Sequence, residues 1–289
     1  FSEADLESLP PLELQIRRAE SFVKLHQNAR VLETLSSVKA IELTAEQNCR
    51  LRFALGVTHR KTHHYRAAAT ELSKVAFSCM DRSIKRRAHY LWAKVVSISD
   101  GLKAIPIIQQ FEDNYPTHTM VDDVLFWAGD LYQRRNKIVL ANSFYSRIPK
   151  LRQDKDHCSD ALWRMSWMAY QKHALPDAIT HLSHSLETPS CIKNIHEKTR
   201  ALYWMGRFYE QQKRIGDMRQ QFEHLLSGYP LTFYGHLARH RLEQLGILDP
   251  LKFRDIRSPA LGDIPSGRWQ EFGKSTELKT VAHHAYYGL

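Results

Sequence analysis

Apolar and small residues recur along this chain with a period of about 37 residues. Six segments align in one register, and they begin at positions 14, 51, 88, 124, 161 and 201. The sixth place in each segment is small: Ala19, Gly56, Ala93, Gly129, Ser166 and Gly206. The third place is Ile16 once and then always aromatic: Phe53, Tyr90, Phe126, Trp163 and Tyr203. The regular spacing indicates one structural unit repeated six times.

A second pair of columns follows each small residue. Twelve positions on stand Val31, Ala68, Ile105, Ala141, Ala178 and Met218. Four positions later stand Leu35, Leu72, Gln109, Tyr145, Leu182 and Phe222, and Gln109 alone breaks the apolar pattern. Helix-stopping prolines come next, at Pro116, Pro149, Pro189 and Pro230. The pattern predicts two amphipathic helices per unit, with the small residue where they approach closely. The expected fold is therefore all-α, a tetratricopeptide-like superhelix.

Such a superhelix is a solenoid in which each hairpin contacts mainly its neighbours, and the first helices form a long inner wall. We expect repeats over residues 1–245. The next segment, 246–273, holds three prolines and four glycines and is expected to be an irregular linker. Residues 274–289 are expected to start a further helix. Because that helix has nothing to pack on, we expect the natural sequence to continue.

The formal charge of +10 and the pI near 9.4 favour an anionic partner, such as nucleic acid or cell wall, or else reflect well-solvated helix faces. The sequence lacks zinc-finger spacing, an RNA-binding aromatic signature and a long basic tail, so a nucleic-acid partner is the third choice. It also lacks an apolar run of the roughly 18 residues needed to span a membrane.

Residues 200–242 carry a resemblance to a known family, the bacterial soluble lytic transglycosylases. The matching residues are Ala201, Tyr203, Trp204, Tyr229, Pro230, Phe233, Tyr234, Gly235, Ala238, Arg241 and Leu242. Segments 115–132 and 160–170 resemble the preceding units of that family, and 277–289 resembles the helix after its linker. The resemblance covers residues 115–289, while the first hundred residues match by periodicity alone.

The resemblance implies a periplasmic protein, exported by a signal peptide not present in this sequence, that acts on peptidoglycan. In that family a C-terminal lysozyme-like domain cleaves the glycan between N-acetylmuramic acid and N-acetylglucosamine, leaving a 1,6-anhydro end. One glutamate, in a Glu-Ser pair followed by Gly-Leu-Met-Gln, is acid and then base. Here Glu7-Ser8 and Glu20-Ser21 lack that continuation, and the "AYYG" at 285–288 lacks the family's Asn.

We therefore expect no catalytic residue in this chain. Its expected role is the non-catalytic repeat region of such an enzyme, with peptidoglycan and the C-terminal catalytic domain as partners, and other cell-wall proteins as further ones. The alternative is a stand-alone helical-repeat scaffold that binds protein. Downstream codons for the catalytic motifs would decide for the first, and a stop codon for the second.

The aromatic column is the candidate binding site. Tyr90, Phe126, Trp163 and Tyr203 recur on the first helices, and aromatic faces stack on sugar rings. Nearby arginines offer pairs for peptide carboxylates: Arg87, Arg164, Arg200 and Arg207. The alternative is that the rings pack between neighbouring repeats. We expect no cofactor and no metal, because His59/His63 and His236/His240 have helical i, i+4 spacing without a carboxylate to complete a set.

Three local features complete the expectations. Cys49 and Cys158 start first helices, and Cys79 and Cys191 lie at or just beyond the ends of the second helices of the same hairpins. This placement favours the disulfides Cys49–Cys79 and Cys158–Cys191, and the alternative is four separate buried thiols. Asp122 and Asp123 are expected to point apart at a helix N-terminus. In the stretch 229–242, Gly235 is expected to allow close approach of a backbone, while Phe233 and Tyr234 seal the end of the stack.

Overall fold

The computed structural model describes residues 11–36, 38, 43–151 and 156–247, and the regular structure there is helical. Within these residues, twelve α-helices form six antiparallel hairpins: α2(Pro11–Lys24) with α3(Asn28–Ser36), α4(Ala45–Lys61) with α5(Tyr65–Ser78), α6(Arg82–Ser99) with α7(Ile105–Asn114), α8(Val121–Gln133) with α9(Ile138–Tyr145), α10(Cys158–Gln171) with α11(Leu175–Glu187), and α12(Ile195–Gln211) with α13(Ile215–Gly228). A further helix, α14(Phe233–Gln244), packs on the last hairpin. The predicted linker, except for Gly246 and Ile247, and the predicted helix 274–289 lie outside the described residues.

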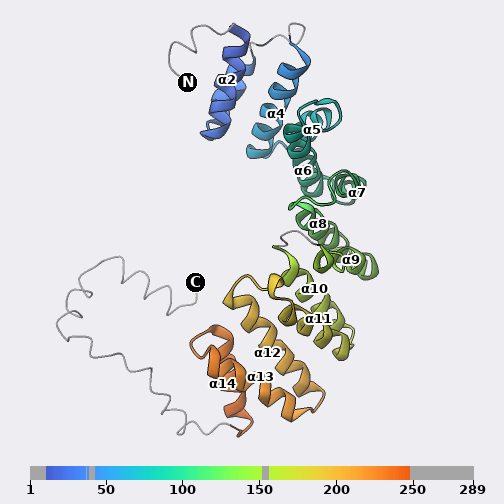
Figure 1. Ribbon diagram of the computed structural model, residues 1–289, viewed down its shortest axis with the longest axis vertical. Coiled ribbons are helices and arrows are strands. Elements are labelled where there is room, and N and C mark those ends of the chain that lie inside the picture. Colours follow the sequence, from blue (N-terminus) through green and yellow to red (C-terminus); the bar gives the residue numbers. More distant parts are fainter. Residues whose placement is uncertain (1–10, 37, 39–42, 152–155, 248–289) are drawn as a thin grey trace, which may run out of the picture.

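The hairpins stack into an arc, with the N-terminal pair at one end and α14 at the other (Figure 1). In the middle of the arc, the first helices α6 and α8 lie on its inner side, and the second helices α7 and α9 lie on its outer side. The core runs through the stack, because each hairpin buries its apolar faces against the hairpins before and after it. The observed fold is the all-α, tetratricopeptide-like superhelix that the two residue columns predict.

The small column lies where the helices of each hairpin touch. A Cβ atom placed on Gly56 would lie 2.7 Å from Cγ of Leu72, and one on Gly129 would lie 2.5 Å from Cε1 of Tyr145. Such distances are shorter than any ordinary carbon–carbon contact, so neither position has room for a side chain. Ser166 fits because its hydroxyl donates a 2.8 Å hydrogen bond to the carbonyl of Ala178.

The third hairpin departs from the repeat where Gln109 breaks the pattern. A short 3₁₀ turn, η2(Gly101–Ala104), comes between α6 and α7, and it begins with Gly101 at φ +60°. The extra turn changes the phase of α7, so that Gln109 is exposed while Ile108 and Phe111 are fully buried. Gln109 therefore lies on the outer surface of the repeat and leaves no gap in the core.

In the other five hairpins, the turn between the helices contains a residue in the left-handed region of φ. These residues occupy one place in the repeat, seven positions after the small residue: His26, His63, Asn136, His173 and Lys213, with φ between 56° and 63°. This conformation is uncommon for residues other than glycine. Each turn is closed by backbone hydrogen bonds, such as the 2.8 Å bond from His64 N to His59 O.

The last helix begins as the stretch 229–242 predicts, with one exception. Thr232 caps α14 by accepting a 3.1 Å hydrogen bond from the amide of Gly235. A Cβ atom on Gly235 would overlap the carbonyl oxygen of Tyr229, so the close backbone approach requires glycine. Tyr234 packs on Tyr203, with ring centroids 5.5 Å apart. The expectation that Phe233 also seals the stack is wrong, because its side chain is 66% exposed.

Candidate functional site: a groove on the inner wall

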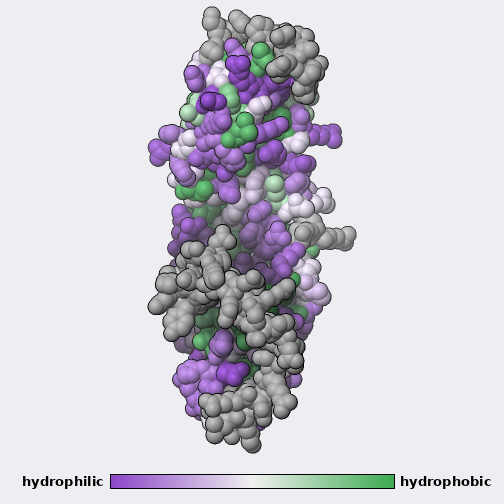
Figure 2. Space-filling view, turned by 90° about the vertical axis from the view of Figure 1, so that its left-hand side faces the viewer, coloured by the Kyte–Doolittle hydropathy of each residue, from purple (hydrophilic) through white to green (hydrophobic). Residues whose placement is uncertain are grey.

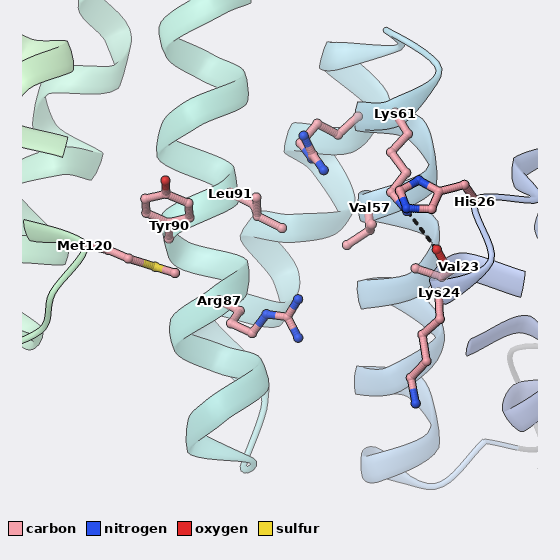
Figure 3. Close-up of a pocket in the computed structure, with 10 residues that line it drawn as sticks. Val23, Lys24, His26, Val57, Lys61, Arg87, Tyr90, Leu91 and Met120 are labelled. Carbon is pink, nitrogen blue, oxygen red and sulfur yellow. Dashed lines mark hydrogen bonds between the residues drawn. The ribbon is translucent and has the colours of Figure 1, made fainter. Parts of the chain in front are cut away.

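The inner wall of the N-terminal half contains a groove of about 320 Å³ that crosses α2, α4 and α6 and reaches the start of α8 (Figure 3). Ten residues line it: Val23, Lys24, His26, Val57, Arg60, Lys61, Arg87, Tyr90, Leu91 and Met120. Four are aliphatic or sulfur-containing side chains, four are Lys or Arg, and the others are histidine and tyrosine. The groove therefore combines an apolar floor with a basic rim.

The repeat itself creates this arrangement. Lys24 and Lys61 occupy the same place in consecutive repeats, as do Val57 and Lys94. Stacked first helices therefore present the same faces side by side, and a small number of positions per repeat produces a continuous surface. In the space-filling view of the inner side, hydrophilic residues surround small hydrophobic areas over the upper, N-terminal part of the stack (Figure 2).

Lys61 is the most constrained cation of the groove. Its ammonium donates a 2.7 Å hydrogen bond to the backbone carbonyl of Val23, across the gap between α4 and α2. Burial and then the positive charge of Arg60 hold the pKa of Lys61 below its usual value. The Nε atom of Arg60 is itself buried without a hydrogen-bond partner in the described residues. These two neighbouring cations therefore share a half-buried site in which no carboxylate of the described residues pairs with them.

An ion-pair cluster lies beside the groove, and two of its members, Glu20 and Arg50, line a depression with Lys24 and Arg87. Arg50 on α4 donates to both carboxylate oxygens of Glu20 at 2.7 Å, and it also bonds Glu13 at 2.8 Å. Hydrogen bonds to these two glutamates raise the pKa of Arg50 despite its burial. Glu20, one of the two Glu-Ser glutamates of the sequence, is thus half of an ion pair between helices.

The predicted aromatic column is present on the first helices, and each ring packs on other protein rings. Phe126 stacks on His157 with centroids 4.5 Å apart, and Tyr203, which is 6% exposed, stacks on Phe222 at 5.6 Å. Trp163 lies 5.9 Å from Trp204 of the next repeat. The structure does not bring the four rings together into one site.

Tyr90 is the member of the column that reaches the groove. Its ring lies 5.1 Å from that of Trp127, and its hydroxyl donates a 3.3 Å hydrogen bond to Asp123. Burial and the charge of Asp123 raise the pKa of this hydroxyl, so Tyr90 stays neutral at physiological pH. Tyr90 lines the groove and is held in place by Trp127 and Asp123 of the next repeat.

The four predicted arginines have different surroundings. Arg200 pairs with Asp160 at 3.0 Å and lies over the ring of Trp163, 4.9 Å from its centroid. Arg207 donates a 3.2 Å hydrogen bond to the hydroxyl of Tyr203 and pairs with Glu210. Arg164 is half-buried on α10. Arg87 lines the groove, where it lies over the ring of Phe53 at 5.4 Å and pairs with no carboxylate of the described residues. A carboxylate-bearing ligand therefore meets an unpaired guanidinium at Arg87.

Sequence reasoning missed one polar junction between the fourth and fifth repeats. Asp122 is 2% exposed and accepts a 3.1 Å hydrogen bond from the backbone amide of His157, while Asp123 accepts one of 3.1 Å from its imidazole Nε2. Both residues lie in the first turn of α8, as expected for a helix N-terminus, and their carboxylates reach two different atoms of His157. The hydrogen bond that its ring donates to Asp123 raises the pKa of His157, and burial raises the pKa of Asp122.

The cysteines lie in two pairs in the structure. Cys49 is joined to Cys79 with Cα atoms 5.4 Å apart, and Cys158 is joined to Cys191 with Cα atoms 4.8 Å apart. Each bond links the start of a first helix to the end of the following second helix or to the short 3₁₀ turn η4(Pro189–Cys191). In the part of the chain that the structure describes, no helix is both long and apolar enough to cross a membrane.

Comparison with known proteins supports the fold class and goes no further. No family model and no curated protein matches the chain. The apo form of the quorum sensor NprR from B. thuringiensis is similar over 99% of this chain and 86% of its own, with 13% identity and a TM-score of 0.50. NprR with its cognate peptide NprX covers 84% and 75%, with 12% identity and a TM-score of 0.44. PilF from Pseudomonas aeruginosa covers 80% and 97%, with 12% identity and a TM-score of 0.46. The chain thus has the architecture of helical-repeat superhelices.

Proposed function

We propose that this chain is a protein-interaction scaffold that binds an extended segment of a partner polypeptide along its inner wall. The observation that carries the proposal is the groove across α2, α4 and α6, which has an aliphatic floor and a basic rim. An interface of this kind has the anatomy of a peptide-binding surface, in which apolar contacts are surrounded by charged ones.

The repeat also fits the proposed ligand. Helices that pack side by side lie about 8–10 Å apart, and an extended peptide advances about 3.3 Å per residue. In a bound extended segment, side chains about three residues apart would therefore contact equivalent positions on consecutive first helices. A single extended segment contacts several repeats, and each contact adds to the binding free energy.

Site-specific photocrosslinking tests the proposal. A benzophenone amino acid at Leu91, in the groove, is compared with one at Val139, which is 77% exposed on the second helix α9. Both replace an apolar residue, so they differ mainly in the surface that they probe. We expect covalent polypeptide adducts from position 91 in cells that make the protein, and none from position 139. Equal adducts from both positions, or none from position 91, would contradict the proposal.

We propose as a second candidate that the chain is the repeat region of a periplasmic lytic transglycosylase, with peptidoglycan and a catalytic domain of the same protein as partners. Two observations favour it. Residues of the matching motif converge in space, since Tyr203 contacts both Trp204 and Tyr234, and Gly235 lies against the carbonyl of Tyr229. The two disulfides fit an oxidising compartment such as the periplasm.

Sequencing of the coding region beyond residue 289 tests this candidate. Codons for Glu-Ser followed by Gly-Leu-Met-Gln support it, and a stop codon contradicts it. The chain by itself is expected to release no anhydro-muropeptides from purified peptidoglycan, because the catalytic motifs are absent from its sequence. Turnover that survives Glu7→Gln and Glu20→Gln would reveal a catalytic site elsewhere in the chain.

A further inference from the structure

Five cations gather on the inner wall of the first three hairpins without an acidic partner. Lys24, Arg60, Lys61 and Arg87 line the groove, and Lys94 lines an adjoining depression of about 330 Å³ that Arg60 and Lys61 share. Each residue of this set, which we call the basic cluster, lies outside ion-pair distance of every carboxylate in the described residues. The cluster comes from three first helices, so the repeat places its charges along the wall.

At first helices further along the chain, several arginines are paired with carboxylates. Arg134 on α8 pairs with Asp130, while Arg200 and Arg207 on α12 pair with Asp160 and Glu210. The C-terminal half of the inner wall thus neutralises these guanidinium groups internally. Arg164 on α10 also has no ion pair among the described residues, so the N-terminal half is distinguished by the gathering of five such cations around adjoining depressions.

The carboxylates that share a depression with members of the basic cluster are already engaged. Asp130, in a depression with Lys94, pairs with Arg134. Glu20 lies in a neighbouring depression together with Lys24 and Arg87, but both of its oxygens accept hydrogen bonds from Arg50. Glu13 is bound by Arg50 and Arg17. These glutamates are therefore committed to another cation, and they leave the cluster open to an anion from outside the chain.

Three members of the basic cluster have hydrogen-bond donors that no carboxylate accepts in the described residues. Arg60 has a buried Nε atom without a partner, and an unpaired buried donor is costly. Lys94 and Arg87 lie over the rings of Trp127 and Phe53, each 5.4 Å from the centroid, and such a contact leaves their N–H groups free to donate to a carboxylate. A docked carboxylate would satisfy these groups with charge-assisted hydrogen bonds.

The floor of the groove decides which anion fits. It is made by Val23, Val57, Leu91 and Met120, which are aliphatic or sulfur-containing. Single-stranded nucleic acid is held by bases that stack on free aromatic faces. Tyr90 does not offer such a face, because its ring packs on Trp127 and its hydroxyl is bound to Asp123. Apolar side chains between acidic ones match this floor better than bases and phosphates.

We propose that the groove binds an acidic peptide segment, with carboxylates on the basic cluster and apolar side chains on the floor between them. The proposal rests on the inner wall being the binding surface, as proposed above, and adds the chemistry of the partner. Four first helices about 8–10 Å apart span about 30 Å, which an extended segment of roughly ten residues covers.

Fluorescence anisotropy with labelled decapeptides tests the proposal. One probe alternates glutamate with leucine and valine, and its matched control has glutamine in place of every glutamate. We expect the acidic probe to bind at least about tenfold more tightly than the control, and to weaken as salt rises, because charge-assisted contacts carry the difference. Equal binding of the two probes, or no binding of the acidic probe at low salt, overturns the proposal.

Paired variants locate the binding. The double variant Lys24→Gln/Arg87→Gln removes two exposed cations of the cluster, and Arg66→Gln/Lys137→Gln removes two exposed cations outside the groove with the same loss of charge. We expect the first pair to weaken the acidic probe about tenfold and the second to leave it within about twofold. Equal losses in both pairs would mean attraction by net charge only and would overturn the assignment.

A single-stranded oligonucleotide of equal charge is the competitor. Displacement of the acidic probe by a lower concentration of oligonucleotide than of unlabelled acidic peptide would overturn the choice of partner in favour of nucleic acid. The photocrosslinking at Leu91 tests the scaffold proposal independently of the acidic partner. Polypeptide adducts there with equal binding of the two probes would retain the scaffold and reject the acidic partner.

Discussion

Gly129 on α8 lies directly against the ring of Tyr145 on α9. A Cβ atom on Gly129 would lie 2.5 Å from Cε1 of that ring, and Tyr145 is fully buried with its hydroxyl bonded to Gln133 at 2.9 Å. The ring therefore has no space into which it can retreat. Gly56 lies against Leu72 in the same way. In both hairpins, the glycine of the first helix allows a large side chain of the second helix to pack against its backbone.

Gly129→Ala is expected to destabilise the chain by about 1–3 kcal/mol, because the added methyl group overpacks the hairpin. The matched control is Gly216→Ala in α13, where an added Cβ meets nothing within 4 Å. There, alanine is expected to be neutral or to stabilise by up to about 1 kcal/mol, as its helix propensity is higher. Denaturant unfolding measures both. A loss at Gly216 as large as at Gly129 would show that the contact with Tyr145 is not the cause.

Much of the fold could be predicted because the two columns report these contacts directly. A small residue followed sixteen positions later by a large one, repeated along the chain, indicates a helical hairpin without any knowledge of the tertiary structure. The turns could not be predicted in the same way. His26, His63 and Lys213 adopt left-handed backbone where glycine would be expected, so the sequence carries no marker for them.

The functional surface was harder to predict for a physical reason. Whether a cation is paired depends on residues one repeat away, as with Arg200 and Asp160. Lys24, Arg60 and Lys61 look like ordinary surface charges in the sequence, and their isolation from carboxylates is visible only after the repeats are stacked. The same holds for His157, which meets Asp122 and Asp123 across a repeat boundary.

The junction at His157 predicts a specific pH dependence. The hydrogen bond that His157 donates to Asp123, together with nearby carboxylate charges, raises the pKa of His157 in the folded state. A raised folded pKa stabilises the fold fully below the unfolded value of about 6.5, and this contribution is lost as pH rises through the folded pKa. His157→Gln should therefore cost more free energy of unfolding near pH 6 than near pH 9.

A double-mutant cycle isolates this effect. In an Asp123→Asn background the pH dependence of the His157→Gln penalty should largely disappear, because the main cause of the raised pKa is gone. Unfolding by denaturant across this pH range provides the measurement. A penalty that grows toward high pH would show that the pair is not the source of the dependence.

Substitutions of Tyr203 test whether its ring packs in the core or is free to contact a ligand. Its ring is 6% exposed and stacked on Phe222, so Tyr203→Ala is expected to cost about 3–5 kcal/mol of stability. Tyr203→Phe keeps the ring and loses only the hydrogen bond from Arg207, at a cost of about 1 kcal/mol. Thermal unfolding of the two variants distinguishes them. A nearly neutral Tyr203→Ala would mean that the ring is free for another partner.

The two disulfides predict the intact mass and the stability of protein that is exported to an oxidising compartment. Intact mass without reductant should be about 4 Da below that of the reduced chain, and removal of either pair should cost about 3 kcal/mol for loops of this length. Cys49→Ser/Cys79→Ser and Cys158→Ser/Cys191→Ser serve as controls for each other. Four free thiols in exported protein would contradict the pairing and remove one support for a periplasmic location.

Hydrogen–deuterium exchange tests the central claim most directly, namely that partners bind to the inner wall formed by the first helices. The chain is measured alone and saturated with the acidic decapeptide. We predict slower exchange in α4 and α6, which carry Lys61 and Arg87, with no change in the outer helices α7 and α9. Protection confined to α7 and α9, or spread evenly over all hairpins, would contradict the account.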